Sequence, residues 1–198
     1  MTAMRRSASV SSGRRGAPSG RNRVRIIAGK WRSRLLKFPP AEQLRPTPDR
    51  VRETLFNWLG QRLDGLACLD LFAGSGALGF EAASRGALEV VMVERDHAIA
   101  KALRESALSL AAEGVRIVED DALGFIARTA QRFDVAFVDP PFASDLAVRV
   151  MQKLSACLNP EARVYVESAA PLALDAPWKA LRADRAGAVR YALYEFCP

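Results

Sequence analysis

A carboxylate, two prolines and an aromatic ring follow one another in the segment VDPPF, residues 138–142. The apolar residues 135–138 are typical of a buried strand that ends at Asp139. Because proline fixes its backbone angle φ, the Asp139 carboxylate and the Pro140 carbonyl point in set directions. These two acceptors can hold both hydrogens of an exocyclic amine, and Phe142 can stack on the base that carries it. The segment predicts a nucleobase-amine site with Asp139, Pro140 and Phe142 as its catalytic residues. A plain strand-end turn with a core phenylalanine is the alternative.

The glycine-rich segment LDLFAGSGALGFEA, residues 69–82, is a second candidate site. Gly74, Gly76 and Gly79 fit the spacing G-x-G-x-x-G between a predicted strand and a predicted helix. Glycines let the backbone turn sharply and approach a ligand closely, and the helix N-terminus then offers free N–H groups. The spacing alone indicates a nucleotide-like cofactor without saying which one, and an ordinary tight strand–helix turn is the alternative.

Three acids at the ends of successive predicted strands select the cofactor. Asp70 would repel a pyrophosphate but attract a cationic ammonium or sulfonium group. Glu94 can accept both hydroxyls of a ribose. Asp121 can reach an adenine amine, although it could instead cap the helix that follows. Together these acids fit S-adenosylmethionine. An NAD-dependent oxidoreductase would also fit the glycine loop, but it leaves VDPPF unexplained.

Basic residues are concentrated at the start of the chain. Residues 1–52 hold 14 basic and two acidic residues, a charge of +12, whereas residues 53–198 hold 15 basic and 20 acidic residues, a charge of −5. A basic front favours a polyanion such as nucleic acid, although basic tails often serve only solubility. The residues predicted to contact RNA are Arg25, Lys30, Trp31, Arg32, Arg34, Arg45, Thr47, Arg50 and Arg52. Trp31 could instead pack on the core.

Strand and helix patterns alternate along the chain, and these elements must position the candidate residues. We predict a hairpin at 24–38 around a Gly-Lys turn, then a helix at 49–63 with Asp49 as its N-cap. Predicted strands at 67–72, 89–96, 115–120, 133–139 and 162–168 alternate with predicted helices at 76–86, 97–112, 122–132 and 145–157. This order predicts an open, doubly wound α/β sheet. Residues 178–184 and 188–196 flank a tight turn at 185–187, so these last two strands must be antiparallel.

The composition excludes several classes of protein. No apolar stretch reaches the roughly 18 residues of a membrane helix, and residues 1–20 lack the apolar region of a secretory signal. The three cysteines, Cys68, Cys157 and Cys197, are far apart, and His97 is the single histidine. Neither a disulfide framework nor a metal site is expected. We predict a cytoplasmic monomer without a membrane partner.

Four segments together resemble the RsmD-type family, bacterial methyltransferases that modify guanine N2 in 16S ribosomal RNA (guanine 966 in the usual RNA numbering). They read RIIAGKWRSRLL, LRPTPDRVRETLFNWL, CLDLFAGSGALGFEAASRGA and FVDPPF. Asp-Pro-Pro-Phe by itself is similar to the motif of amino-methyltransferases that act on DNA adenine, RNA guanine or protein glutamine. The resemblance runs from about residue 24 to the C-terminus. It implies a class I, Rossmann-like methyltransferase fold, a seven-stranded sheet whose last strand is antiparallel.

The resemblance also implies roles for individual residues. It implies cofactor contacts at Asp70, Phe72, Ala73, Gly74, Ser75, Gly76, Glu94, Arg95, Asp121 and Ala122. It assigns the target amine to Asp139 and Pro140. Family members often have a neutral Asn-type residue near the position of Asp121, which alters the expected geometry of the adenine contact. The resulting division is a disordered basic tail at 1–21, an RNA-facing hairpin and loop at 22–48 and a methyltransferase domain at 49–198.

The leading hypothesis is therefore an S-adenosylmethionine-dependent guanine-N2 methyltransferase of small-subunit ribosomal RNA. Methylation of another base, such as a DNA or RNA adenine, and a non-catalytic RNA-binding assembly factor are the alternatives. A small domain with a modest basic surface has difficulty finding one guanine by charge alone. We therefore expect the substrate to be an assembling or assembled small ribosomal subunit.

Overall fold

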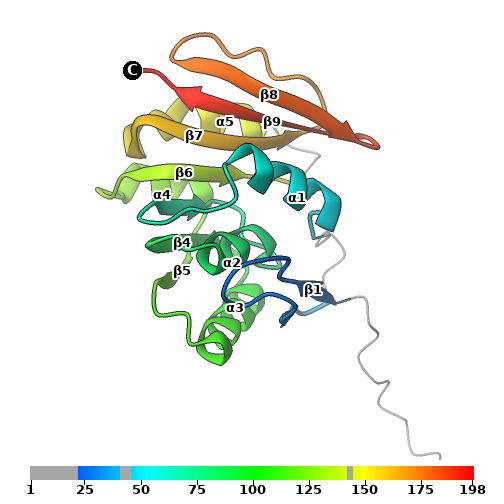
Figure 1. Cartoon of the computed structure of the whole chain (residues 1–198). Helices are drawn as coiled ribbons and strands as arrows, with labels where there is room; N and C mark the ends of the chain where they lie inside the picture. The colour runs from blue at the N-terminus through cyan, green and yellow to red at the C-terminus, as the bar shows by residue number, and fades with distance from the viewer. Residues whose placement is uncertain (1–21, 41–45, 142–144) are drawn as a thin grey trace, which may run out of the picture.

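Alternating strands and helices build a seven-stranded sheet with helices on both faces, beside a separate two-stranded hairpin (Figure 1). The computed structural model describes residues 22–40, 46–141 and 145–198. The predicted tail at 1–21 lies outside the described residues. The large sheet contains β3 (Ala67–Asp70), β4 (Glu89–Glu94), β5 (Val115–Glu119), β6 (Phe133–Val138), β7 (Leu158–Ser168), β8 (Trp178–Ala186) and β9 (Val189–Phe196). The helices are α1 (Asp49–Trp58), α2 (Ala77–Ser84), α3 (His97–Leu110), α4 (Ala122–Arg128) and α5 (Leu146–Leu154), followed by a 3-10 turn at Ser155–Cys157.

The strand order β5-β4-β3-β6-β7-β9-β8 confirms the predicted doubly wound sheet. Strands β3 to β7 run parallel to one another, and β9 is antiparallel to both β7 and β8. From β3 the chain goes to β4 and β5 on one side and then returns to β6 on the other. The crevice at the carboxyl ends of β3 and β6 is thus the topological switch point, where such sheets bind ligands.

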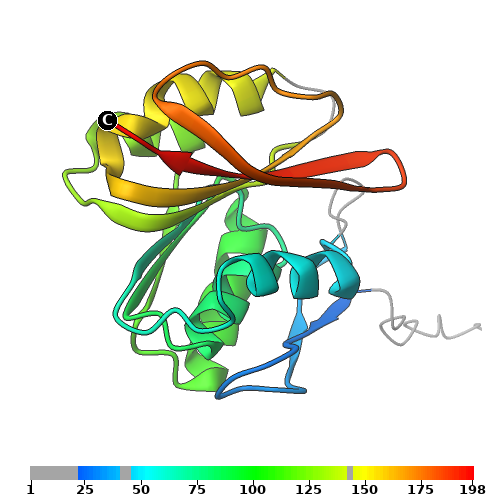
Figure 2. The ribbon, with the colours of Figure 1, turned by 45° about the horizontal axis from the view of Figure 1, so that its top comes forward.

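Side chains along each strand alternate between two apolar layers. Cys68, Phe137 and Tyr165 belong to the layer that includes α1, α2, α3 and the hairpin. Leu69 and Val166 belong to the opposite layer, which includes α4 and α5. Figure 2 shows α1 and the hairpin together on their side of the sheet. Because strand side chains alternate with a period of two, this layering decides which face each residue at a strand end will point to.

The small hairpin pairs β1 (Arg23–Arg25) with β2 (Leu35–Lys37). It docks closely on α2, since a Cβ added to Gly29 would lie 1.8 Å from the Ser84 carbonyl oxygen. The backbone N–H of Lys30 donates to this carbonyl at 2.7 Å, and the N–H of Trp31 donates to the Ser84 hydroxyl at 2.9 Å. The Gly-Lys turn of the hairpin is therefore fixed to α2, the helix that follows the glycine loop.

Some predicted boundaries were wrong. The first helix ends at Trp58 instead of residue 63, and the chain then turns at Gly60, whose φ of 90° is left-handed. Pro48 is its N-cap residue and Asp49 is the first helical residue, so the Asp49 carboxylate is free to form ion pairs. The fourth helix ends before the extended residue Thr129, and β7 begins at Leu158, four residues before the expected start. Within the described ranges, no helix is long and apolar enough to cross a membrane.

Candidate active site

The parallel strands β3, β4, β6 and β7 each place a carboxylate at the carboxyl edge of the sheet. Asp70 is the last residue of β3, Glu94 ends β4, Asp139 follows β6 and Glu167 lies near the end of β7. Asp70 is paired in register with Phe137, and Val138 with Val166, which sets Asp139 beside Glu167. By strand alternation, Asp70, Asp139 and Glu167 all point to the face that carries α1, α2 and the hairpin.

Asp70 has a buried oxygen without a partner. Its side chain is 2% exposed, and Oδ2 accepts a hydrogen bond from the Gly79 N–H at 3.0 Å. Its Oδ1 has no hydrogen-bond partner among the described residues. Burial raises the pKa of this carboxyl to about 7, against the opposing effect of the Gly79 N–H. A buried acceptor in this state suits a cationic or hydrogen-bond-donating ligand, as the amino-acid end of S-adenosylmethionine would be.

The glycine loop requires glycine at two positions. Gly74 and Gly76 have φ values of 49° and 78°, in the left-handed region that side chains disfavour. A Cβ added to Gly76 would also lie 2.6 Å from the Phe80 ring. The Gly74 N–H donates to Glu94 Oε2 at 2.9 Å, and the Asp96 N–H donates to Oε1 at 2.8 Å. Both oxygens of Glu94 are thus oriented, and each keeps a second lone pair for a ribose hydroxyl.

The other predicted cofactor residues surround this loop. Phe72 is half-buried, Ala73 and Ser75 are buried, and Arg95 is exposed. Asp121 caps α4, because its Oδ1 accepts a hydrogen bond from the Gly124 N–H at 2.9 Å, and Ala122 is the buried first residue of that helix. Asp121 therefore caps the helix, as in the alternative weighed for it, and only its Oδ2 remains for a contact with adenine.

Asp139 is held by a hydroxyl from the loop before α1. Thr47 Oγ1 donates to Asp139 Oδ2 at 3.3 Å. Burial raises the pKa of Asp139 well above its usual range, and the negative charges of Glu167 and Asp70 raise it further, whereas the Thr47 hydroxyl opposes the shift. Such a carboxyl takes up a proton more readily than an ordinary aspartate does.

Glu167 is a member of this site that the sequence analysis missed. It is 4% exposed, and the Tyr165 hydroxyl donates to its Oε1 at 2.9 Å. Burial raises the pKa of Glu167, while hydrogen bonds from the Tyr165 and Thr47 hydroxyls lower it. The available signal was the acid at the end of the run Val164–Val166, the same signal that identified Asp70 and Glu94.

The charges around these acids are unbalanced. None of the ion pairs in the described part of the chain involves Asp70, Asp139 or Glu167. The described residues also contain no group of three or more His, Cys, Asp or Glu side chains that could hold a metal ion. The three acids are therefore available to cationic and hydrogen-bond-donating ligands.

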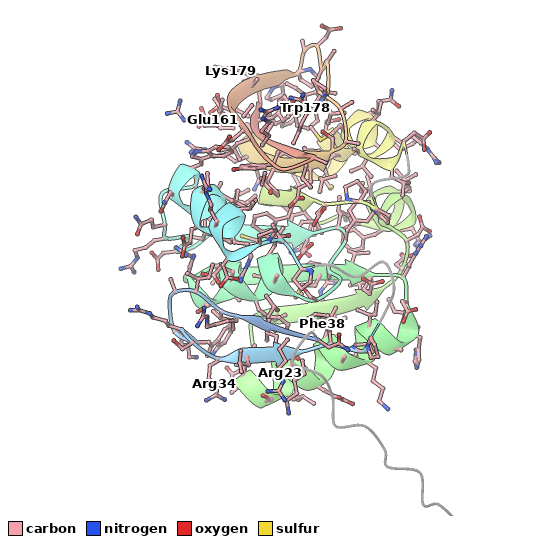
Figure 3. The ribbon with its side chains drawn as sticks, turned by 90° about the vertical axis from the view of Figure 1, so that its right-hand side faces the viewer. Arg23, Arg34, Phe38, Glu161, Trp178 and Lys179 are labelled. Carbon is pink, nitrogen blue, oxygen red and sulfur yellow. The ribbon has the colours of Figure 1, made fainter. Side chains whose placement is uncertain are left out.

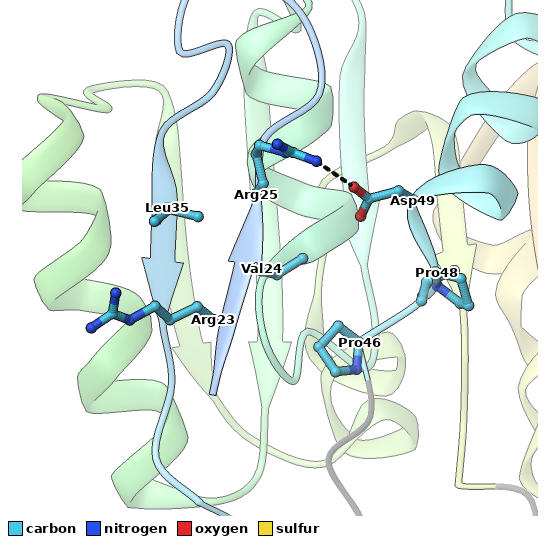
Figure 4. A pocket seen from close by; sticks show the side chains of 8 residues that line it. Arg23, Val24, Arg25, Leu35, Pro46, Pro48 and Asp49 are labelled. Carbon is cyan, nitrogen blue, oxygen red and sulfur yellow. Dashed lines mark hydrogen bonds and ion pairs between the residues drawn. The ribbon is translucent and has the colours of Figure 1, made fainter. Parts of the chain in front are cut away.

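A pocket of about 410 Å³ lies between the hairpin and the loop before α1 (Figure 4). It is lined by Arg23, Val24, Arg25, Leu35, Pro46, Thr47, Pro48 and Asp49. Arg25 pairs with Asp49 at 3.4 Å on one wall, and Thr47 joins the pocket to Asp139. Thr47 therefore has contacts both with this pocket and with the strand-end acid Asp139.

The predicted RNA contacts have different environments. Lys30, Arg32, Arg34 and Arg50 are exposed, and Arg34 lies at the hairpin end of the molecule (Figure 3). Trp31 is half-buried and packs against the core, as in the alternative weighed for it, with the Lys30 ammonium 5.6 Å from its ring centroid. Arg45 and the catalytic candidate Phe142 lie outside the described residues.

Arg52 does not suit the predicted contact with RNA. Its side chain is fully buried, where it pairs with Asp49 Oδ1 at 2.7 Å and with Glu81 Oε2 at 3.3 Å. It also donates to the backbone carbonyls of Thr47 at 3.2 Å and Arg25 at 2.8 Å. Its guanidinium therefore ties the hairpin, the loop before α1 and helix α2 together, and it cannot reach a phosphate.

Comparison with known proteins identifies the family. Residues 24–195 match the model of a family described as Conserved hypothetical protein 95. A relative from Escherichia coli K12 named ribosomal RNA small subunit methyltransferase D is 43% identical over 182 residues, which cover 89% of this chain and 92% of the relative. A relative of the same name from Haemophilus influenzae is 41% identical over 186 residues, which cover 90% and 96%. This chain belongs to the RsmD-type family.

A solved structure from Escherichia coli agrees with this assignment. It shares 42% sequence identity and superposes with a TM-score of 0.80 over 88% of this chain and 98% of the other. Membership in the RsmD-type family confirms the predicted resemblance, the class I methyltransferase fold and the use of S-adenosylmethionine, the methyl donor of this class. It leaves the NAD-dependent alternative without support.

Proposed function

We propose that this protein transfers a methyl group from S-adenosylmethionine to the exocyclic N2 amine of a guanine in 16S ribosomal RNA, the guanine numbered 966. The observation that carries the proposal is the half-buried carboxylate of Asp139, which has no ion-pair partner among the described residues and is joined through Thr47 to a pocket beside the basic hairpin. The relatives named ribosomal RNA small subunit methyltransferase D support the choice of RNA. The choice of guanine N2 rests on the resemblance of the four sequence segments to the RsmD-type family.

The cofactor fits the acids at the ends of β3 and β4. Asp70 Oδ1 would accept the ammonium of its amino-acid part, Glu94 its ribose hydroxyls, and Asp121 its adenine amine. The remaining proposed contacts are Phe72, Ala73, Gly74, Ser75, Gly76, Arg95 and Ala122. Bound S-adenosylmethionine supplies an activated methyl group carried on a positively charged sulfur. The negative charge of Asp70 and Asp139 favours a cation at this edge of the sheet.

The target amine is proposed to lie against Asp139 and Pro140. The carboxylate and the Pro140 carbonyl would hold the two N2 hydrogens and so orient the lone pair of the nitrogen. When N2 gains the methyl group it must lose one proton, and the Asp139 carboxylate, whose pKa is raised by burial, is suited to accept it. Phe142 is proposed to stack on the guanine, which must leave its helix to enter the site.

Exposed cations on the hairpin and on α1 are proposed to hold the RNA backbone. They are Arg25, Lys30, Arg32, Arg34 and Arg50, with Arg45 from the loop between β2 and α1. If several of them contact phosphates, binding should weaken steeply with salt. The substrate is proposed to be the RNA within a small ribosomal subunit, because these few cations give little sequence discrimination on their own.

The proposal is tested by methyl transfer from labelled S-adenosylmethionine to small-subunit particles and to free RNA, both from cells that lack this gene. Mass spectrometry then identifies the modified nucleoside. We expect N2-methylguanosine with the wild type and a loss of about 10³-fold or more with Asp139→Ala, while cofactor binding by calorimetry persists. The exposed-loop variant Asp175→Asn is the matched control. Methylation of a different nucleoside, or full activity of Asp139→Ala, would overturn the proposal.

A further inference from the structure

Glu167 is the one buried acid at the carboxyl edge that the steps above leave without a role. It lies beside Asp139 because the register pairs Val138 with Val166 on the adjacent parallel strands. Both side chains point to the face covered by the loop before α1, from which Thr47 reaches them. Glu167 is therefore placed against the same ligand edge as Asp139. The inference that follows rests on the proposed function and deepens it.

Glu167 keeps acceptor positions that its protein partners leave open. The Tyr165 hydroxyl donates to its Oε1 at 2.9 Å, whereas the one hydrogen of the Thr47 hydroxyl is donated to Asp139. Burial raises the pKa of Glu167, and the Tyr165 donor opposes this shift. No ion pair of the described residues neutralises Glu167, and a carboxylate has more lone pairs than this one hydroxyl uses. A further donor from a ligand would complete its hydrogen bonding.

Two adjacent carboxylates match the Watson–Crick edge of only one standard base. Guanine presents N1–H and the N2 amine side by side, both as donors. Adenine and cytosine place a ring-nitrogen acceptor next to their exocyclic amine, and that lone pair would face a carboxylate. Two acceptors that face each other without a hydrogen between them are strongly disfavoured in a site closed to water. A site built to accept a hydrogen bond therefore rejects an analogue that lacks the donor hydrogen.

We propose that Glu167 accepts a hydrogen bond from guanine N1–H while Asp139 and Pro140 hold the N2 amine. Glu167 thereby sets the preference for guanine over adenine and cytosine, a distinction that the Asp-Pro-Pro-Phe segment does not make. The geometry also explains the burial of Tyr165, whose hydroxyl orients Glu167 from within the same strand.

The test uses RNA in which the methylated guanine, once mapped by mass spectrometry, is replaced by 2-aminopurine. This analogue keeps the N2 amine and lacks the N1 hydrogen, so it separates the two contacts. We expect the wild type to prefer guanine over 2-aminopurine by about 10–100-fold in kcat/KM. Glu167→Gln should lower kcat/KM for guanine by a similar factor and leave that for 2-aminopurine equal or higher, because an amide can donate to the unprotonated N1.

Three further variants separate specificity from positioning. Tyr165→Phe should lower the preference for guanine less than Glu167→Gln does, since the carboxylate remains. Glu167→Asp should keep the preference for guanine with reduced kcat. The matched control is Glu195→Gln, because Glu195 lies on the adjacent strand β9 and pairs with Lys179. This variant should leave kcat/KM unchanged for both guanine and 2-aminopurine. Calorimetric binding of S-adenosylmethionine shows that each variant is folded.

The outcomes distinguish this inference from the function on which it rests. If Glu167→Gln slows guanine and 2-aminopurine by the same factor, Glu167 only positions Asp139 and the inference is overturned. If the wild type methylates guanine but does not discriminate against 2-aminopurine, the inference again fails and the proposed function stands. If the wild type modifies a different nucleoside or none, the proposed function is overturned and the inference falls with it.

Discussion

Two groups of buried charges lie on the same face of the sheet and are balanced differently. Glu81 of α2 is fully buried and receives the guanidinium groups of Arg52 and Arg85 at 3.3 Å and 2.8 Å. It also accepts hydrogen bonds from the backbone N–H groups of Ile27 and Ala28. The acids at the strand ends have no such cations in the described ranges. A buried acid with its cations holds segments together, whereas a buried acid without them is prepared for a ligand.

The two groups are joined by one loop residue. Arg52 donates to the Thr47 carbonyl, and the Thr47 hydroxyl donates to Asp139. The balanced group therefore fixes the position from which the unbalanced group is oriented. The hairpin proposed to bind RNA is fixed to the same helix that begins at the glycine loop, so its position depends on the balanced group as well.

The largest expected effect comes from breaking the balanced group. Glu81→Gln should lower the free energy of unfolding by about 3–5 kcal/mol, because it leaves Arg52 buried without its full counter-charge. Asp139→Asn should leave this free energy unchanged or raise it, because it removes a half-buried acid that no cation of the described residues compensates. Urea unfolding at pH 8, followed by tryptophan fluorescence, measures both. Glu53→Gln, an exposed residue of α1, is the control.

If the first group is structural and the second is prepared for a ligand, Glu81→Gln must lower the free energy of unfolding and Asp139→Asn must not. If Glu81→Gln costs less than about 1 kcal/mol, the level of an exposed ion pair, then the network around it does not hold the hairpin. If Asp139→Asn destabilises the protein as much as Glu81→Gln, both groups are structural and the distinction between them is wrong.

The sequence predicted the unbalanced group better than the balanced one. Asp70, Glu94 and Asp139 could be found because each ends an apolar run, and the order of strands and helices implies that these ends meet at one edge of the sheet. Arg52 was assigned to RNA because it continues a run of exposed cations. Its partner Glu81 is 29 positions away on another helix, and nothing in the local pattern shows that the two are buried together.

The roles of Glu167 and Thr47 could also not be predicted from the local sequence, because both depend on tertiary contacts. The strand that ends at Glu167 was predicted, but its register against β6 decides that Glu167 lies beside Asp139, and register is a property of the assembled sheet. Thr47 was expected to face RNA, and its bond to Asp139 across 92 positions arises only when the loop before α1 folds over the strand ends.

A smaller effect should appear in the pH dependence of stability. The pKa of Asp70 is about 7 in the folded protein, above the ordinary value of 3.8. Between these two values the folded state binds a proton that the unfolded state has lost. The contribution of Asp70 is therefore fully present below about pH 4 and is lost as the pH rises through 7. The loss is at most about 4 kcal/mol.

Urea unfolding of the cofactor-free protein at pH 5 and pH 8 measures this loss. Asp70→Asn should reduce the difference in unfolding free energy between the two pH values by about 2–3 kcal/mol. It should also weaken binding of S-adenosylmethionine. Asp139 and Glu167 contribute in the same direction in both proteins, and because the charge of Asp70 raises the pKa of Asp139, the variant removes that part of the Asp139 contribution as well. The exposed Asp64→Asn is the control. An unchanged difference in Asp70→Asn would show that Asp70 is ionised when folded.

The smallest expected effect concerns Thr47, which links the two groups. Thr47→Val keeps the shape of the side chain and removes the hydroxyl that donates to Asp139 at 3.3 Å. The loss of one such hydrogen bond is worth about 1 kcal/mol, so methyl transfer should fall about 5–10-fold. Because this hydroxyl lowers the pKa of Asp139, its removal should also move the acidic limb of the pH–rate profile to higher pH.

Thr47→Ser should restore both the rate and the profile, since it returns the hydroxyl without the methyl group. Binding of the small-subunit particle, measured at several salt concentrations, should be the same in all three proteins, because a hydroxyl bound to Asp139 is not a phosphate contact. If Thr47→Val instead weakens particle binding and leaves the pH profile unchanged, Thr47 contacts RNA, as its position in the basic segment first suggested. The link between the balanced and unbalanced groups would then have no chemical consequence.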